Sequence, residues 1–128
     1  MLKLSLRSVA ILFALSAPAL AASQNWNVTE ESPAGVKSSQ GIWTVRIDNN
    51  KISGDANMQR DNGAVLTYAL DGSVHDSVYT VNTVNRSDGK KDCVWSGHSP
   101  THDDQRSRGL IGEVLCDGKT AFTIRAGF

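Results

Sequence analysis

The chain has 128 residues, and its thirteen basic and thirteen acidic side chains are scattered along it. Nucleic acids and anionic membrane surfaces are bound by concentrated basic faces, so this charge pattern argues against both as partners. The length suits one domain and not two.

Residues 1–21 have the pattern of a secretory signal peptide. Lys3 and Arg7 precede a short apolar run, and small residues follow it up to Ala21. The run is too short to cross a bilayer core of roughly 30 Å. We therefore expect export to the periplasm or the medium, and a mature domain of residues 22–128 without a membrane span. The mature domain keeps eleven basic against thirteen acidic residues.

After the signal, hydrophobic and polar residues alternate with a period of two, which is typical of strands with one buried face. Trp43, Val45 and Ile47, for example, share one side of their segment. No segment shows a comparable helical period. The candidate strands are residues 26–30, 42–48, 51–59, 64–70, 78–84, 92–97, 110–116 and 121–126.

Short polar segments that favour turns separate these strands. We predict turns at Asn49-Asn50, Asp61-Asn62-Gly63, Asp71-Gly72, Ser87-Asp88-Gly89 and Asp117-Gly118, and a longer loop over residues 30–41. Turns between consecutive strands give antiparallel hairpins. The sequence therefore predicts an all-β antiparallel meander of seven or eight strands. Closure into a small barrel would bury one face of each strand and remove exposed edges.

The two cysteines, Cys93 and Cys116, both belong to the predicted mature domain. In an oxidising compartment an even number of cysteines usually forms bridges, so we predict a Cys93–Cys116 disulfide. The bridge would join consecutive antiparallel strands at the base of the longest hairpin.

The segment Gly41-Ile42-Trp43 resembles the G-x-W motif that opens the first strand of the calycins, the superfamily of lipocalins, avidins and small bacterial metalloprotease inhibitors. Arg125 is placed like the arginine that packs across that tryptophan and seals the barrel end. This resemblance implies a closed barrel with Trp43 and Arg125 in contact. The amino-terminal plug of the protease inhibitors and the biotin-binding residues of the avidins have no recognisable counterparts here.

The loop of residues 97–109 is the most polar segment, and long loops on small barrels often carry function. Its candidate binding residues are His98, His102, Asp103, Asp104, Arg106 and Arg108. His98, His102 and Asp103 are suitable ligands for zinc or copper. Pro100 makes a helix improbable here, so the spacing of the histidines does not demand a metal site. The alternatives are a solvated loop, in which basic residues offset the aspartates, and a partner-binding loop.

Catalytic residues are not indicated by the sequence. His75, Asp76 and Ser77 are adjacent, and adjacent strand residues point apart, so they do not form a triad. The glutamates show no spacing that pairs them for glycoside hydrolysis. We therefore expect a protein that is not an enzyme and that needs no cofactor.

We predict a small exported binding protein of the bacterial envelope, whose sharpest version inhibits a secreted or periplasmic hydrolase. The first alternative is a carrier of a small hydrophobic ligand in the barrel mouth, with Trp26, Trp43 and Trp95 as stacking surfaces. The second alternative is metal binding by the 97–109 loop.

Overall fold

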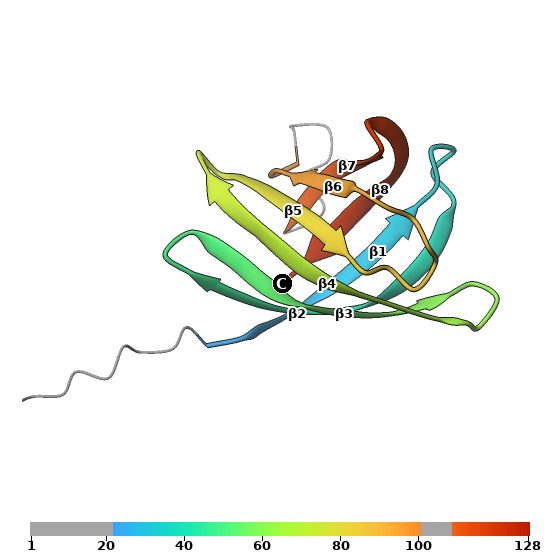
Figure 1. The fold of residues 1–128 in the computed structure, drawn as a ribbon, viewed down its shortest axis with the longest axis horizontal. Coiled ribbons are helices and arrows are strands. Elements are labelled where there is room, and N and C mark those ends of the chain that lie inside the picture. The colour runs from blue at the N-terminus through green and yellow to red at the C-terminus, as the bar shows by residue number, and fades with distance from the viewer. Residues whose placement is uncertain (1–21, 101–108) are drawn as a thin grey trace, which may run out of the picture.

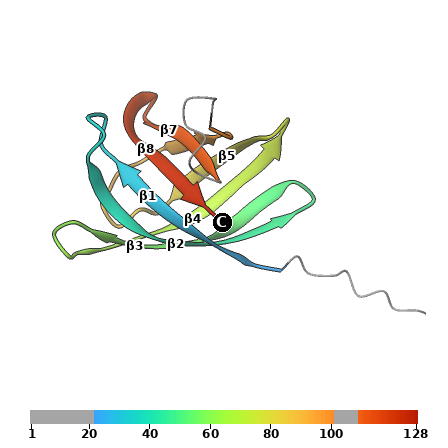
Figure 2. The same ribbon diagram turned by 180° about the vertical axis from the view of Figure 1, so that it is seen from behind.

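The structure is a computed structural model that describes residues 22–100 and 109–128. Its eight strands pair antiparallel in chain order, and the last strand pairs with the first, so the predicted barrel is confirmed (Figure 1). Figure 2 shows the seam where β8 meets β1. The strands are β1 (Gln24–Glu31), β2 (Lys37–Asp48), β3 (Lys51–Arg60), β4 (Val65–His75), β5 (Val78–Val84), β6 (Cys93–Gly97), β7 (Leu110–Cys116) and β8 (Lys119–Gly127).

Alternating burial matches the period-two pattern of the sequence. On β3, for instance, Ile52, Ala56 and Met58 are buried, whereas their strand neighbours are exposed. Several predicted turns also form, and the Asn49-Asn50 turn has positive φ values of 50° and 64° at its two residues. This conformation matches the twist of the flanking strands. Within the described residues, no helix is long and apolar enough to cross a membrane.

Two predicted connections differ from the structure. The expected loop over residues 30–41 is mostly strand, because β1 runs to Glu31 and β2 begins at Lys37. The turn expected at Asp71-Gly72 lies inside β4, and the chain turns at Asp76-Ser77 instead. A side chain at position 72 would overlap the backbone of Thr80 on β5. This glycine therefore marks a close approach of two strands, not a turn.

The interior is filled by an aromatic column. Trp43 and Trp95 are both 0 % exposed and meet edge to face, with their ring centroids 5.3 Å apart. Trp26 also stacks on Trp43, with their ring centroids 6.4 Å apart. The ring of Trp95 lies where a side chain at Gly97 would be, so the glycine makes room for the indole. The core is thus built around three large rings.

The two ends of the barrel carry different side chains, and we name them after those residues. The charged end holds the β1–β2, β3–β4 and β7–β8 turns and the loop of residues 85–92, and buries Glu30 and Arg86. The aromatic end holds the β2–β3 and β4–β5 turns, with Trp26, Tyr79 and Phe128 in contact. In Figure 1 the β2–β3 and β4–β5 tips project on the opposite side from the β1–β2 and β3–β4 tips.

The predicted disulfide is present between Cys93 and Cys116, which are direct cross-strand partners on β6 and β7. The pairing continues away from the bridge to His98 and Ile111, so the bridge closes the base of this hairpin as predicted. Cys93 also lies where the 85–92 loop enters β6. The bridge therefore anchors one end of that loop.

Candidate functional site

A buried ionic network occupies the charged end. Glu30 on β1 is only 3 % exposed, and it points inward because it continues the alternation of Trp26 and Val28. Arg86, in the loop after β5, is 6 % exposed. Isolated charges are rarely buried without partners, since leaving water costs several kcal/mol. The contacts of these two side chains therefore decide whether the end is stable.

Arg86 binds two carboxylates at once. Its Nη1 and Nη2 donate to Glu30 Oε1 and Oε2 at 3.1 and 3.2 Å. Its Nε and Nη2 donate to the carboxylate of Asp88 at 3.1 and 2.9 Å. Planar guanidinium groups match carboxylates in this two-bond geometry, which is among the strongest hydrogen-bonded arrangements in proteins. Arg86 therefore ties its own loop to β1.

Neutral donors complete the surroundings of the Glu30 carboxylate. Tyr68 Oη donates to Oε1 at 2.9 Å, and Ser39 Oγ donates to Oε2 at 2.8 Å. Trp43 Nε1 in turn donates to Tyr68 Oη at 2.9 Å. Among the described residues, no buried side-chain nitrogen or oxygen lacks a partner. The network is thus fully hydrogen-bonded and reaches the central tryptophan of the core.

Two aromatic rings enclose the guanidinium of Arg86. Its Cζ lies 4.5 Å from the ring centroid of Tyr68 and 4.9 Å from that of Phe122. Both distances allow a cation–π interaction. The cation is therefore held by carboxylates at its nitrogens and by rings at its carbon.

The network shifts the titration of its members. Burial opposes the charged form of Asp88, but the hydrogen bonds and charge of Arg86 outweigh it and lower the pKa of Asp88 to about 2. Burial likewise opposes the charged form of Arg86, yet the hydrogen bonds to Asp88 and Glu30 raise its pKa above the ordinary range. Burial, and then the charge of Glu30, raise the pKa of Tyr68. The Arg86–Asp88 salt bridge is therefore formed at neutral pH.

A small cleft leads from the surface to this network. Its volume is about 170 Å³, which is room for several water molecules. Its lining includes Glu30, Asp88 and Phe122 of the network, together with Arg60 and Lys90. Glu30 is thus both a member of the buried network and part of the lining of the cleft.

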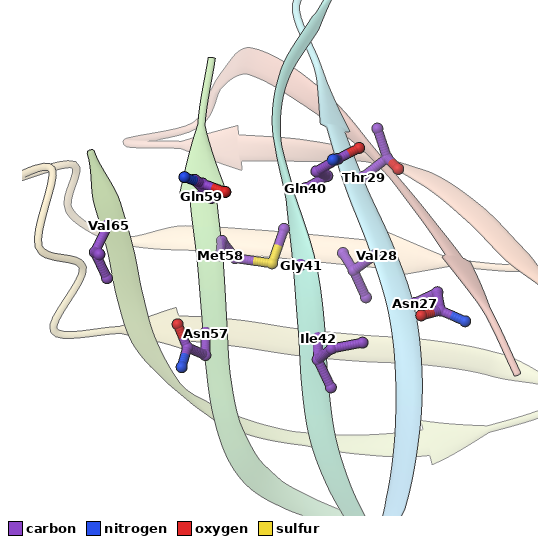
Figure 3. Close-up of a pocket in the computed structure, with 10 residues that line it drawn as sticks. All are labelled: Asn27, Val28, Thr29, Gln40, Gly41, Ile42, Asn57, Met58, Gln59 and Val65. Carbon is purple, nitrogen blue, oxygen red and sulfur yellow. The ribbon is translucent and has the colours of Figure 1, made fainter. Parts of the chain in front are cut away.

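A second feature is a shallow groove on the outer wall, with a volume of about 570 Å³ (Figure 3). It crosses β1 to β4, and its polar lining consists of amides and a hydroxyl without a charged side chain. Gly41 forms part of the groove, and a side chain there would overlap the backbone of Asn57 and Met58 on β3. Two exposed aliphatic residues, Ile42 and Val65, also line it. The polar residues of the lining are Asn27, Thr29, Gln40, Asn57 and Gln59.

The predicted seal joins Trp43 and Arg125, which lie on opposite faces of the barrel wall in the structure. Trp43 points into the core, whereas Arg125 lies on the outer face of β8, where its Nε donates to Glu31 Oε1 at 3.0 Å. The physical reason is that side chains alternate between the two faces of a strand, and the neighbouring residue Ile124 takes the inward position. The guanidinium of Arg86 does lie on two interior rings, those of Tyr68 and Phe122.

The predicted binding loop is described only in part. His98 is exposed, and its Nδ1 lies 2.9 Å from the carbonyl oxygen of Ser99. The other candidates, His102, Asp103, Asp104, Arg106 and Arg108, lie outside the described residues. In the part of the chain that the structure describes, no three His, Cys, Asp or Glu residues gather as metal ligands do. Metal binding by this loop stays a prediction.

Sequence reasoning missed Arg86 and Asp88 as site residues. Both lie in a loop, where no period tells which way a side chain points. The one available signal was Glu30, whose inward position follows from the alternation of β1. An inward carboxylate requires a buried cation or donors, but the sequence does not say which of the basic residues supplies it.

Comparisons with protein-family models, curated proteins and solved structures found no match to this chain. What the site can do therefore follows from its own residues. The charged end holds a guanidinium group, and the outer groove offers hydrogen-bond donors and acceptors beside two aliphatic side chains.

Proposed function

We propose that this chain is an exported, non-enzymatic protein of the bacterial envelope that binds another protein through the outside of its barrel. The filled interior is the observation that carries this proposal. Trp43 and Trp95 are fully buried, and their indole nitrogens donate to Tyr68 Oη and to the carbonyl oxygen of Gly112. Recognition is therefore assigned to the outer surface.

The same packing gives no support to carriage of a hydrophobic ligand. A carrier needs apolar side chains that face an open cavity. The three tryptophans that were candidates for this task contact one another or internal hydrogen-bond partners instead. A ligand would have to displace them, which would forfeit the close packing of the core.

The groove across β1 to β4 is the contact surface that we propose. Asn and Gln side chains bind the donors and acceptors of peptide groups, and Ile42 and Val65 are 38 % and 67 % exposed. Protein interfaces combine such apolar contacts with hydrogen bonds at about one per 100–200 Å². A neutral, polar protein surface therefore fits the groove better than a nucleic acid or a charged ligand.

Export and inhibition complete the proposal. The signal-like residues 1–21 and the disulfide favour an oxidising compartment, the periplasm or the medium. In the sharpest version the partner is a secreted or periplasmic hydrolase, and binding blocks its activity. The rigid, disulfide-linked barrel suits this role, because preorganised surfaces lose little entropy on binding.

The test is capture of a partner from envelope extract with the mature chain as bait. Asn57→Arg places a charge in the groove, and we expect it to weaken capture at least tenfold. Thr80→Arg is the matched control, because it adds the same charge to an exposed outer position on β5. Failure of the wild-type chain to retain a stoichiometric partner would refute the binding role. Equal capture by both variants would refute the groove as the contact surface. Assay of the captured protein for hydrolase activity, with and without the barrel, tests inhibition.

A further inference from the structure

The side chain of Arg86 sits in a box whose walls come from other parts of the chain. Glu30 lies on β1, Tyr68 on β4 and Phe122 on β8, so three strands of the barrel supply the walls. Thr83 on β5 adds a hydroxyl 3.3 Å from Nη1. Arg86 itself belongs to the connecting loop of residues 85–92. The barrel wall therefore supplies Glu30 and the two rings, and the loop supplies the cation together with the Asp88 carboxylate.

The chemistry of the box is specific for a planar cation. The two oxygens of Glu30 accept one hydrogen bond each from the two terminal nitrogens of the guanidinium. The rings of Tyr68 and Phe122 lie within cation–π distance of its central carbon. An ammonium group is a point charge and cannot make the same paired contact with a carboxylate. The arrangement thus matches guanidinium better than other cations.

We propose that Glu30, Tyr68 and Phe122 form a guanidinium-binding site, which Arg86 occupies from within the chain. When the Arg86 side chain is absent or withdrawn, the site takes a free guanidinium compound or the arginine side chain of another protein. In the structure the 85–92 loop fills this site with its own Arg86 side chain, and it thereby excludes other guanidinium groups. This inference concerns the charged end alone and does not depend on the groove or on its partner.

Access supports the proposal. The cleft of about 170 Å³ at this end already reaches Glu30 and Phe122 from the surface. Arg60 also lines the cleft, and Lys90 Nζ is 5.9 Å from the Phe122 ring and 3.5 Å from Asp88 Oδ2, so a guanidinium ligand has to enter against two positive charges. Asp88 also pairs with Arg86 and remains in the loop after Arg86 is truncated. A ligand that replaces the Arg86 side chain therefore finds both carboxylates in place.

The test is chemical rescue of Arg86→Ala by N-ethylguanidinium, a copy of the missing side-chain end. We expect the variant to unfold at a lower temperature than the wild type. The ligand should then raise its Tm saturably, by about 5 °C when present at about ten times its Kd. Wild-type protein should show no such rise, because its site is filled. A short arginine-containing peptide as second ligand distinguishes a site for small molecules from one that also accepts a protein side chain.

Three controls separate the site from general effects. Arg46→Ala removes an exposed arginine from the outer face of β2 and should give no rescue. N-ethylurea has the shape of the ligand without its charge and should fail on Arg86→Ala. The double variant Glu30→Gln/Arg86→Ala lacks the carboxylate and should bind N-ethylguanidinium at least tenfold more weakly.

Two results would overturn the proposal. The first is a folded Arg86→Ala variant whose Tm does not rise, or rises equally with N-ethylurea. The second result concerns the case in which Arg86→Ala does not fold in the absence of a ligand. N-ethylguanidinium present during refolding should then restore a cooperative unfolding transition, and a chain that stays unfolded in its presence contradicts a site built by the barrel wall.

Discussion

The two ends of the barrel are closed by different physical means. At the charged end, Arg86 makes directional bonds to Glu30 and Asp88, and all three groups depend on one another. At the aromatic end, Tyr79 and Phe128 cover Trp26 with ring contacts at 5.8 and 5.1 Å. Removing one ring from a cluster of ring contacts costs only the packing of that ring. Removing one partner of a buried ion pair leaves the other charge uncompensated, which is strongly destabilising. The ends should therefore differ sharply in their tolerance of substitution.

Glu30→Ala should produce the largest loss in the free energy of unfolding. It leaves Arg86 buried with only Asp88 as a charged partner, and breaking a buried pair costs about 3–5 kcal/mol. Urea denaturation of wild type and variant measures the difference in the free energy of unfolding.

The matched control is Glu31→Ala, because Glu31 is the next residue and pairs with Arg125 on the partly exposed outer face. This variant should lose less than about 1 kcal/mol of its free energy of unfolding. Similar losses for both variants would show that burial adds nothing to the network. Replacing Glu30 and Arg86 together by Met should cost less than Glu30→Ala, since no buried guanidinium is left and Asp88 keeps Lys90 as a charged partner.

Removal of the disulfide should be the next largest effect and should act on the charged end. Cys93→Ala/Cys116→Ala opens a loop with a sequence separation of 23 residues, which corresponds to about 3 kcal/mol of stability in the chain-entropy model. Hydrogen exchange should increase first in the 85–92 loop, because Cys93 anchors its end. An increase confined to the aromatic end would contradict this assignment.

The contrast between the ends also explains how far the sequence predicts this molecule. Period-two alternation predicts seven or eight strands and the inward side of Trp43, Tyr68 and Phe122, because burial on one face leaves a direct trace in the sequence. The prediction of a turn at Asp71-Gly72 was wrong, because glycine occurs both in turns and where two strands approach each other closely. Arg86 could not be predicted, since its direction depends on partners that are distant in the sequence, such as Glu30.

Acid should weaken the charged end through Asp88. Its pKa is lowered to about 2 in the folded state, so its ion pair contributes fully above the ordinary carboxyl pKa of roughly 4. The contribution is lost as the pH falls from about 4 to about 2 and amounts to about 2 kcal/mol. Asp88→Asn should therefore be less stable than wild type at pH 7 and should approach it below about pH 2. Unfolding curves at several pH values measure this, and a constant difference would refute the role of Asp88.

Phe128→Ala should have the smallest effect and thereby sharpens the comparison. Its ring lies on Trp26 but is 63 % exposed, so truncation removes little buried area and should cost below about 1 kcal/mol. Trp26 should become more accessible, which iodide quenching of tryptophan fluorescence detects. A loss as large as that of Glu30→Ala would mean that both ends depend equally on single side chains. A small loss of stability together with increased quenching would show that the aromatic end tolerates substitution better than the charged end. The reason is that removing a ring there reduces the buried apolar area but leaves no unpaired charge.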